Sequence, residues 1–171
     1  MHLIIDGYNV LGRTSTGLNQ LESAREVLLR DLATYRQRKS HAITVVFDGW
    51  QQGQLSEGRE HRAGIQVIYS KRGEKADQVI QRLAREYGSD CAVVSSDHEI
   101  MNAARAHGAF VMGAQEFVAK LHDLSVPPGR VPYKELDTGE DTVVRRGSEK
   151  KGNPRKLPKS QRQRDRHLKR F

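Results

Sequence analysis

The 171-residue chain lacks the features that mark several large classes of protein. It contains a single cysteine, Cys91, so a disulfide framework is impossible and a reducing compartment suits the protein. No apolar run approaches the length of a membrane span, and an apolar segment begins at Leu3 without the basic region of a signal peptide before it. We therefore expect a cytoplasmic protein that has no membrane partner.

Several catalytic and cofactor-binding patterns are also absent. The chain has no Gly-x-Gly-x-x-Gly sequence, which argues against dinucleotide binding, and no glycine-rich phosphate loop. It has neither a cysteine nor a Ser–His pair suited to nucleophilic catalysis. A phosphatase acting on small molecules is disfavoured, because Asp6-Gly7-Tyr8 lacks a second acid two residues after Asp6. We expect no organic cofactor.

The excess of positive charge lies at the C-terminal end of the chain. The sequence has 29 Lys and Arg against 21 Asp and Glu, and residues 145–171 hold 12 of the basic residues and 2 of the acidic ones. A body without excess positive charge and a basic tail indicate a polyanionic partner, and nucleic acid is favoured over a membrane surface. We predict a domain at 1–123, a linker or hairpin at 124–146, and a basic tail at 147–171 that is disordered or becomes helical on a partner.

Residues 1–123 show the alternation of strands and helices that is typical of an α/β domain. Continuous apolar runs predict five strands, at 3–5, 43–47, 65–69, 91–94 and 109–112. Apolar residues at helical spacing predict helices at 21–35, 76–87, 100–107 and 114–122. Residues 51–64 are polar and are expected to form a mobile loop. The predicted architecture is a mostly parallel five-stranded sheet flanked by helices.

Acidic residues lie where the functional sites of parallel sheets are found. Three predicted strands are followed by Asp6, Asp48 and Asp97, and Asp77 lies in the first turn of the predicted helix 76–87. Ligands bind at the carboxyl ends of parallel strands, so we expect these four carboxylates to converge. Converging carboxylates repel one another, which raises the pKa of at least one of them unless a cation is bound. Carboxylate oxygens suit Mg²⁺ or Mn²⁺, which can activate water for phosphodiester hydrolysis.

Each acidic residue also has a purely structural interpretation. Asp6-Gly7 and Asp48-Gly49 are typical turn sequences. Asp97 can serve as a helix N-cap, and Ser96-x-x-Glu99 fits a capping box. Asp77 can have no role other than a favourable interaction with the dipole of its helix. The occurrence of all four at one predicted edge of the sheet favours the functional interpretation.

Other polar residues are secondary candidates. Asn9 can orient a water or the scissile phosphate, or it can be an ordinary loop residue. Trp50 can stack on a base or pack at the rim of the site, and His98 is expected at the surface. Basic residues that can contact phosphates, or lie in solvated segments, are Lys71, Arg72, Lys75, Arg145, Arg146, Lys150, Lys151, Arg155 and Lys156.

Four segments of the chain resemble motifs of the NYN family of PIN-like nucleases, specifically its YacP-like branch. The matching segments are Ile-Ile-Asp6-Gly7-Tyr8-Asn9, Val-Phe-Asp48-Gly49, Gly73-Glu74-Lys75-Ala76-Asp77-Gln78-Val79-Ile80 and Val-Ser-Ser-Asp97-His98-Glu99-Ile100. The resemblance implies a Rossmann-like PIN/NYN fold and Mg²⁺-dependent cleavage of RNA. The branch includes an endoribonuclease that enters the ribosomal A site and cuts translated mRNA.

The resemblance also implies roles for single residues. Asp6, Asp77 and Asp97 match the metal-binding carboxylates, Asn9 accompanies the first of them, and Asp48 is a less certain fourth ligand. Some relatives have a further acid four residues after the Asp97 position, where this chain has Met101. A second metal site then requires Glu99 or Glu74 as a substitute.

Two hypotheses of function follow from the sequence. The first is a metal-dependent endoribonuclease in which the body cuts RNA and the basic tail binds RNA, in particular mRNA, or the ribosome. The second is a non-catalytic RNA- or ribosome-binding factor that has the same fold. If the chain cleaves RNA and the Asp6→Asn and Asp97→Asn variants do not, the endoribonuclease is favoured over the binding factor.

Overall fold

The computed structural model describes residues 1–12, 18–49 and 56–125, all of which belong to one compact unit, Met1–Val126. The predicted linker or hairpin, the basic tail and Trp50 lie outside the described residues. Among the helices of the described part, none is long and apolar enough to cross a membrane.

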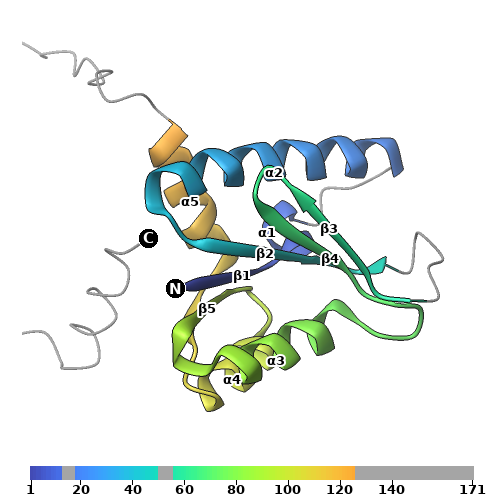
Figure 1. Cartoon of the computed structure of the whole chain (residues 1–171), viewed down its shortest axis with the longest axis vertical. Helices are drawn as coiled ribbons and strands as arrows, with labels where there is room; N and C mark the ends of the chain where they lie inside the picture. The colour runs from blue at the N-terminus through green and yellow to red at the C-terminus, as the bar shows by residue number, and fades with distance from the viewer. Residues whose placement is uncertain (13–17, 50–55, 126–171) are drawn as a thin grey trace, which may run out of the picture. The chain divides into compact units, whose positions relative to one another are not determined.

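Six strands form one sheet in the order β3-β4-β2-β1-β5-β6 (Figure 1). They are β1 His2–Asp6, β2 Ala42–Phe47, β3 Gly58–Arg62, β4 Ile65–Tyr69, β5 Cys91–Val94 and β6 Phe110–Met112. Neighbouring strands are parallel except for β3 and β4, which are antiparallel. The structure therefore confirms the predicted α/β class and the mostly parallel sheet.

The sheet has one strand more than the sequence predicts. β3 lies within 51–64, where a structureless loop is expected, and it pairs with β4 from Gly58 opposite Tyr69 to Arg62 opposite Ile65. Its sequence, Gly-Arg-Glu-His-Arg, has no apolar side chain, and the last four residues are exposed. Hydrophobic periodicity detects only strands that bury side chains. The prediction of five strands is therefore wrong, and so is the loop at 58–62.

Helices cover both faces of the sheet. The helices are α1 Gly7–Leu11, α2 Leu18–Lys39, α3 Ala76–Tyr87, α4 His98–Ala106 and α5 Ala114–Ser125. α3 and α4 pack together on one face, and α1, α2 and α5 pack on the other (Figure 1). The helix predicted at 76–87 is confirmed with the same bounds, whereas α1 was not predicted.

Each face of the sheet has a buried core. On the side of α3, Ile4, Val46 and Ile68 pack against Val79 and Ile80 of that helix. On the side of α2 and α5, the fully buried rings of Tyr35 and Phe117 contact each other with centroids 5.5 Å apart. Side chains of both faces are thus buried, which explains why the strands are continuously apolar in sequence.

The first strand leads directly into α1. The Asp6 side chain accepts a hydrogen bond from the backbone N–H of Asn9 and caps the helix. Gly7, the first residue of α1, lies so close to the Phe47 ring of β2 that a Cβ atom at this position would clash with the ring. Gly7 is therefore required for close packing of α1 on β2, and Asp6-Gly7 does not form the turn that was considered as an alternative.

Candidate active site

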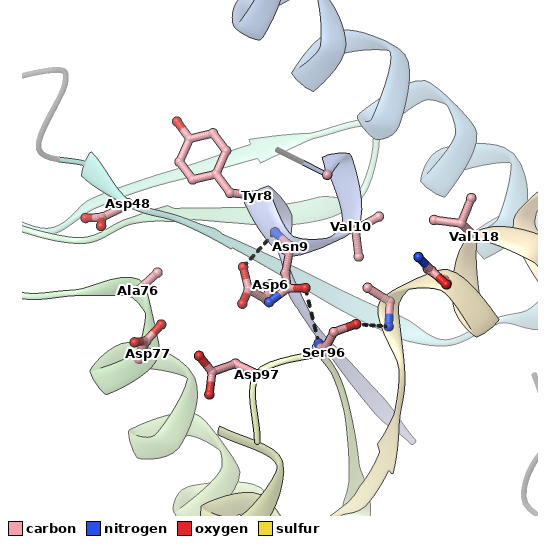
Figure 2. A pocket seen from close by; sticks show the side chains of 13 residues that line it. Asp6, Tyr8, Asn9, Val10, Asp48, Ala76, Asp77, Ser96, Asp97 and Val118 are labelled. Atoms are coloured by element: carbon pink, nitrogen blue, oxygen red, sulfur yellow. Dashed lines mark hydrogen bonds between the residues drawn. The ribbon is translucent and has the colours of Figure 1, made fainter. Parts of the chain in front are cut away.

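A cavity of about 660 Å³ lies at the carboxyl ends of β1 and β2 and beside the N-termini of α3 and α4. All four carboxylates singled out in the sequence line it: Asp6, Asp48, Asp77 and Asp97. Asp6 ends β1, Asp48 follows β2, Asp77 lies in the first turn of α3, and Asp97 is the N-cap of α4. Figure 2 shows these side chains around one opening.

Asp6 is the most buried of the four carboxylates. Only 7% of its surface is exposed, and both of its oxygens accept hydrogen bonds, Oδ1 from the Asn9 N–H at 3.1 Å and Oδ2 from the Ser95 hydroxyl at 3.1 Å. Burial raises the pKa of the Asp6 carboxyl above its ordinary value, although these hydrogen bonds act in the opposite direction. The side chain is therefore held in one orientation at the floor of the cavity.

Two buried serines that sequence reasoning did not select hold two of the carboxylates. Ser95 follows β5 and donates to Asp6 of the neighbouring strand, and Ser70 follows β4 and donates to Asp48 Oδ1 at 2.9 Å. Ser95 Oγ also accepts the backbone N–H of Asp97 at 3.1 Å. Both serines directly follow a buried strand, and this position could have identified them in the sequence. The carboxylate that each serine contacts becomes known only from the order of the strands in the sheet.

Asp77 and Asp97 point toward each other across the cavity (Figure 2). Asp97 Oδ1 accepts the Glu99 N–H at 2.7 Å, as the N-cap alternative predicted. Burial raises the pKa of the Asp77 carboxyl, and the negative charges of Asp97 and Asp48 add to this rise, while Lys75 opposes it. The carboxylates of the cavity therefore repel one another as the sequence implied, and the free energy of this repulsion falls when a cation binds between them.

The carboxylate oxygens that line the cavity are the kind of ligand that Mg²⁺ and Mn²⁺ prefer. As they stand, no three His, Cys, Asp or Glu side chains within the described residues are placed closely enough to hold a metal ion together. Mg²⁺ usually retains several waters and binds through one or two carboxylates together with oxygens of a substrate phosphate. The facing pair Asp77 and Asp97 fits this type of site, with Asp6 fixed beside it.

Comparisons with known proteins identify the family. Residues 3–162 match the YacP-like NYN domain family. The chain belongs to this family. It is 29% identical over 130 residues to the uncharacterized protein YacP of Bacillus subtilis (strain 168), covering 71% of this chain and 75% of that protein. NYN domains are typically nucleases, so the family supports a hydrolase that acts on nucleic acids.

Solved structures agree with the family and with its NYN/PIN-like fold. A crystal structure of Rae1 (YacP) from Bacillus subtilis superimposes with a TM-score of 0.60 at 27% identity, covering 72% of this chain and 75% of the other. A crystal structure of a mutant of the same Bacillus subtilis protein gives a TM-score of 0.60 at 28% identity, with coverage of 72% and 76%.

In this NYN domain, Asn9 bridges two elements at the edge of the cavity. Its Nδ2 donates to Ser95 Oγ and its Oδ1 accepts the Ser96 N–H, each at 3.2 Å. Asn9 thereby ties α1 to the segment between β5 and α4 that carries Asp97. The observed contacts give Asn9 a role in positioning Asp97, and its place in the cavity lining leaves it accessible to a ligand.

The remaining candidate residues of the NYN domain lie outside the cavity lining. Lys71, Arg72 and Lys75 belong to the loop between β4 and α3, and His98 is exposed at the start of α4. Within the described part of the chain, no Lys or Arg lines the cavity. Among the described residues, a basic contact to a substrate phosphate can therefore come only from the rim of the cavity.

The two candidates for a substitute acid differ in their surroundings. Glu74 Oε1 accepts from Arg82 Nη1 at 2.8 Å, so Glu74 is engaged with α3. Glu99, in the first turn of α4, contributes to the raised pKa of Asp77. Neither lines the cavity, and Met101 occupies the next turn of α4.

Proposed function

We propose that this NYN domain is a metal-dependent endoribonuclease that hydrolyses phosphodiester bonds of RNA. The observation that carries the proposal is the meeting of four carboxylates, from four different parts of the fold, in one cavity at the carboxyl edge of the sheet. Such an arrangement is unfavourable for folding alone, because burial and, in addition, the negative charges of Asp97 and Asp48 raise the pKa of Asp77. The typical nuclease activity of NYN domains supports the same assignment.

The residues have separate roles in this proposal. Asp77 and Asp97 hold Mg²⁺ or Mn²⁺, and Asp6 stands beside them in an orientation fixed by Ser95 and Asn9. The bound cation supplies activation of water and stabilises negative charge on the leaving oxygen. Asp48, held by Ser70, adds negative charge to the lining, which favours a cation in the cavity.

The proposed substrate is mRNA, and the proposed place of action is the ribosome in the cytoplasm. The motif resemblance to the YacP-like branch implies this assignment, and the basic residues of 145–171 support it because they carry the charge needed to bind RNA or a ribosomal surface. Lys71, Arg72 and Lys75 precede Asp77 in the chain and can guide the RNA backbone toward the cavity.

A non-catalytic RNA- or ribosome-binding factor is the second candidate. The observation that favours it is that no three potential metal ligands are assembled among the described residues. In such a factor, the acidic cavity would persist as part of the fold, and binding would depend on the basic residues alone.

Cleavage assays separate the two candidates. The full chain is incubated with single-stranded RNA, with DNA of the same sequence and with translating ribosomes, in Mg²⁺, Mn²⁺ or EDTA. We expect RNA cleavage that requires a divalent cation and falls about a hundredfold or more in Asp77→Asn and Asp97→Asn, because an oxygen ligand of the cation is weakened.

The matched control is Asp90→Asn, which makes the same substitution at an exposed aspartate outside the cavity. It should cleave RNA like the unmodified chain. Intact RNA under every condition, together with normal RNA binding, would support the binding factor instead. Cleavage of DNA at the same rate would contradict the assignment to RNA.

A further inference from the structure

The cavity extends well beyond its carboxylates. Its volume of about 660 Å³ lies within the range of roughly 300–1,000 Å³ found for pockets that hold small organic ligands. The wall away from Asp77 is formed by α1 and α5, which contribute Val10, Ala114, Gln115 and Val118. Divalent cations prefer oxygen ligands, so these valines have no function in binding a metal. This wall is therefore available for a second contact with the substrate.

We call the wall formed by Val10, Ala114, Gln115 and Val118 the slot. Val10 of α1 and Val118 of α5 are both half-buried, and Figure 2 shows their side chains facing each other across the opening. Ala114, the first residue of α5, is buried, and its backbone N–H donates to Ser96 Oγ at 3.2 Å. That bond joins the α5 wall to the loop that carries Asp97. The slot is therefore fixed next to the acidic part of the cavity.

The chemistry of the slot fits a nucleobase better than a phosphate. No Lys or Arg is found among the described residues that line the cavity, so these residues offer no positive charge to an anion. A base has flat apolar faces and polar edges, and valine side chains can contact the faces. The exposed Gln115 amide carries both donor and acceptor atoms, which suit the polar edge of a base.

We propose that the slot of Val10, Ala114, Gln115 and Val118 is a nucleobase subsite for one unpaired nucleotide next to the cleaved bond. The proposal rests on the proposed nuclease function and specifies its substrate. The base packs against Val10 and Val118, and Gln115 contacts its edge. A base within a double helix cannot enter, so the preferred substrate is single-stranded RNA. The identity of this one base then influences where the chain cuts.

Binding of the base is tested without cleavage. Valine methyl resonances of the full chain are recorded while the four nucleoside 5′-monophosphates are added, with ribose 5-phosphate as the ligand that lacks a base. We expect the methyl resonances of Val10 and Val118 to shift with at least one nucleotide and to remain in place with ribose 5-phosphate. Val27, an exposed valine of α2 outside the cavity, is the internal control. Equal shifts with ribose 5-phosphate, or no shift at Val10 and Val118, would overturn the subsite.

A cleavage experiment tests the same contact in RNA. Oligonucleotides with a single abasic nucleotide at successive positions around the cut are compared with the unmodified RNA. For the unmodified chain, we expect kcat/KM to fall about tenfold at one position, because the apolar contact of one base with the two valines is lost. Val118→Trp fills the slot and should remove this sensitivity, whereas Val27→Trp should retain it. An abasic effect of the same size in all three proteins would refute the proposal.

The two experiments distinguish failure of the subsite from failure of the nuclease function. Methyl shifts at Val10 and Val118 without any RNA cleavage would retain the subsite and reject the nuclease. Cleavage without these methyl shifts would retain the nuclease and reject the subsite. The resonance experiment needs no variant, so it decides the question even if Val118→Trp does not fold.

Discussion

At the level of single residues, the carboxylates of the cavity are held in different ways. Asp6 and Asp48 each accept a hydrogen bond from a buried serine of the neighbouring strand, and Asp97 accepts one from the backbone at the start of α4. The pKa of Asp77 is raised mainly by burial and further by the charges of Asp97 and Asp48. The charged form of Asp77 therefore destabilises the folded chain, and this destabilisation can be measured by substituting Asp77.

We predict that Asp77→Asn raises the melting temperature in EDTA at neutral pH. The pKa of Asp77 in the folded chain is above the ordinary value of 3.8. The protonated Asp77 carboxyl thus contributes fully to stability at a pH below its pKa in the unfolded chain. This contribution is lost as the pH rises through its pKa in the folded chain. The gain from Asp77→Asn should therefore be present at pH 7 and shrink toward pH 3.8. Thermal unfolding at a series of pH values checks this.

The exposed Asp90 provides the control, because Asp90→Asn should alter the melting temperature much less. A lower melting temperature of Asp77→Asn at pH 7, or an equal gain at every pH, would contradict the assigned origin of the raised pKa.

The convergence of the four carboxylates that line the cavity was predicted from the sequence, but the serines that hold two of them were not. Asp6, Asp48 and Asp97 could be selected because each follows an apolar run, and Asp77 because it opens an amphipathic helix. The contacts of Ser95 with Asp6 and of Ser70 with Asp48 join residues that are 89 and 22 positions apart in the chain. Such contacts depend on strand order, which local patterns do not encode.

At the level of elements, the helices and strands that bury much apolar surface were predicted from the sequence, and those that bury little were missed. α3 was predicted with its observed bounds because Val79, Ile80 and Leu83 form a buried stripe, and Gly88 ends the helix. α1 was missed because its five residues are too few to show helical periodicity. β3 was missed because its pairing with β4 involves the backbone and leaves the side chains exposed.

The packing of α1 on β2 leads to a prediction about Gly7. Gly7→Ala should lower the free energy of unfolding by about 1–3 kcal/mol, because the added methyl group meets the buried Phe47 ring and forces α1 to shift. RNA cleavage should fall as well, since α1 carries Asn9 and is capped by Asp6. Urea unfolding and the cleavage assay measure the two effects.

Two further variants make this test specific. Gly113→Ala is the matched control, since a Cβ atom at Gly113 has no neighbour within 4 Å, and it should be nearly neutral. Phe47→Leu combined with Gly7→Ala should be less destabilised than the sum of the single variants, because the smaller side chain leaves room for the methyl group. Strict additivity would show that the clash with Phe47 is not the cause.

For the whole molecule, acidic and basic residues lie in different parts of the sequence, so the proposed catalysis and the proposed attachment to RNA depend on different residues. The cavity is acidic, and residues 145–171 carry 12 basic and 2 acidic residues. RNA is a polyanion, so the acidic part of the cavity by itself repels it, and a cation or the basic segments must offset this repulsion. The two tasks can therefore be removed independently.

We predict that deletion of residues 145–171 weakens RNA binding and lowers its dependence on salt. If the tail neutralises even about six phosphates, affinity in the full chain falls by orders of magnitude between about 50 and 200 mM salt, and the truncated chain should lose most of this slope. Cleavage at saturating RNA should persist because the carboxylates remain. Binding isotherms at several salt concentrations check the prediction, and an unchanged slope after truncation would refute it.

The charged edge strand β3 also bears on how the molecule behaves at high concentration. β3 ends the sheet, so its outer backbone groups are not paired within the sheet, and the exposed Arg59, Glu60, His61 and Arg62 surround them. An edge of this kind is a poor template for strand addition, because a second chain would have to remove water from charged side chains. The feature that concealed β3 from sequence patterns is thus the one that protects the sheet from aggregation.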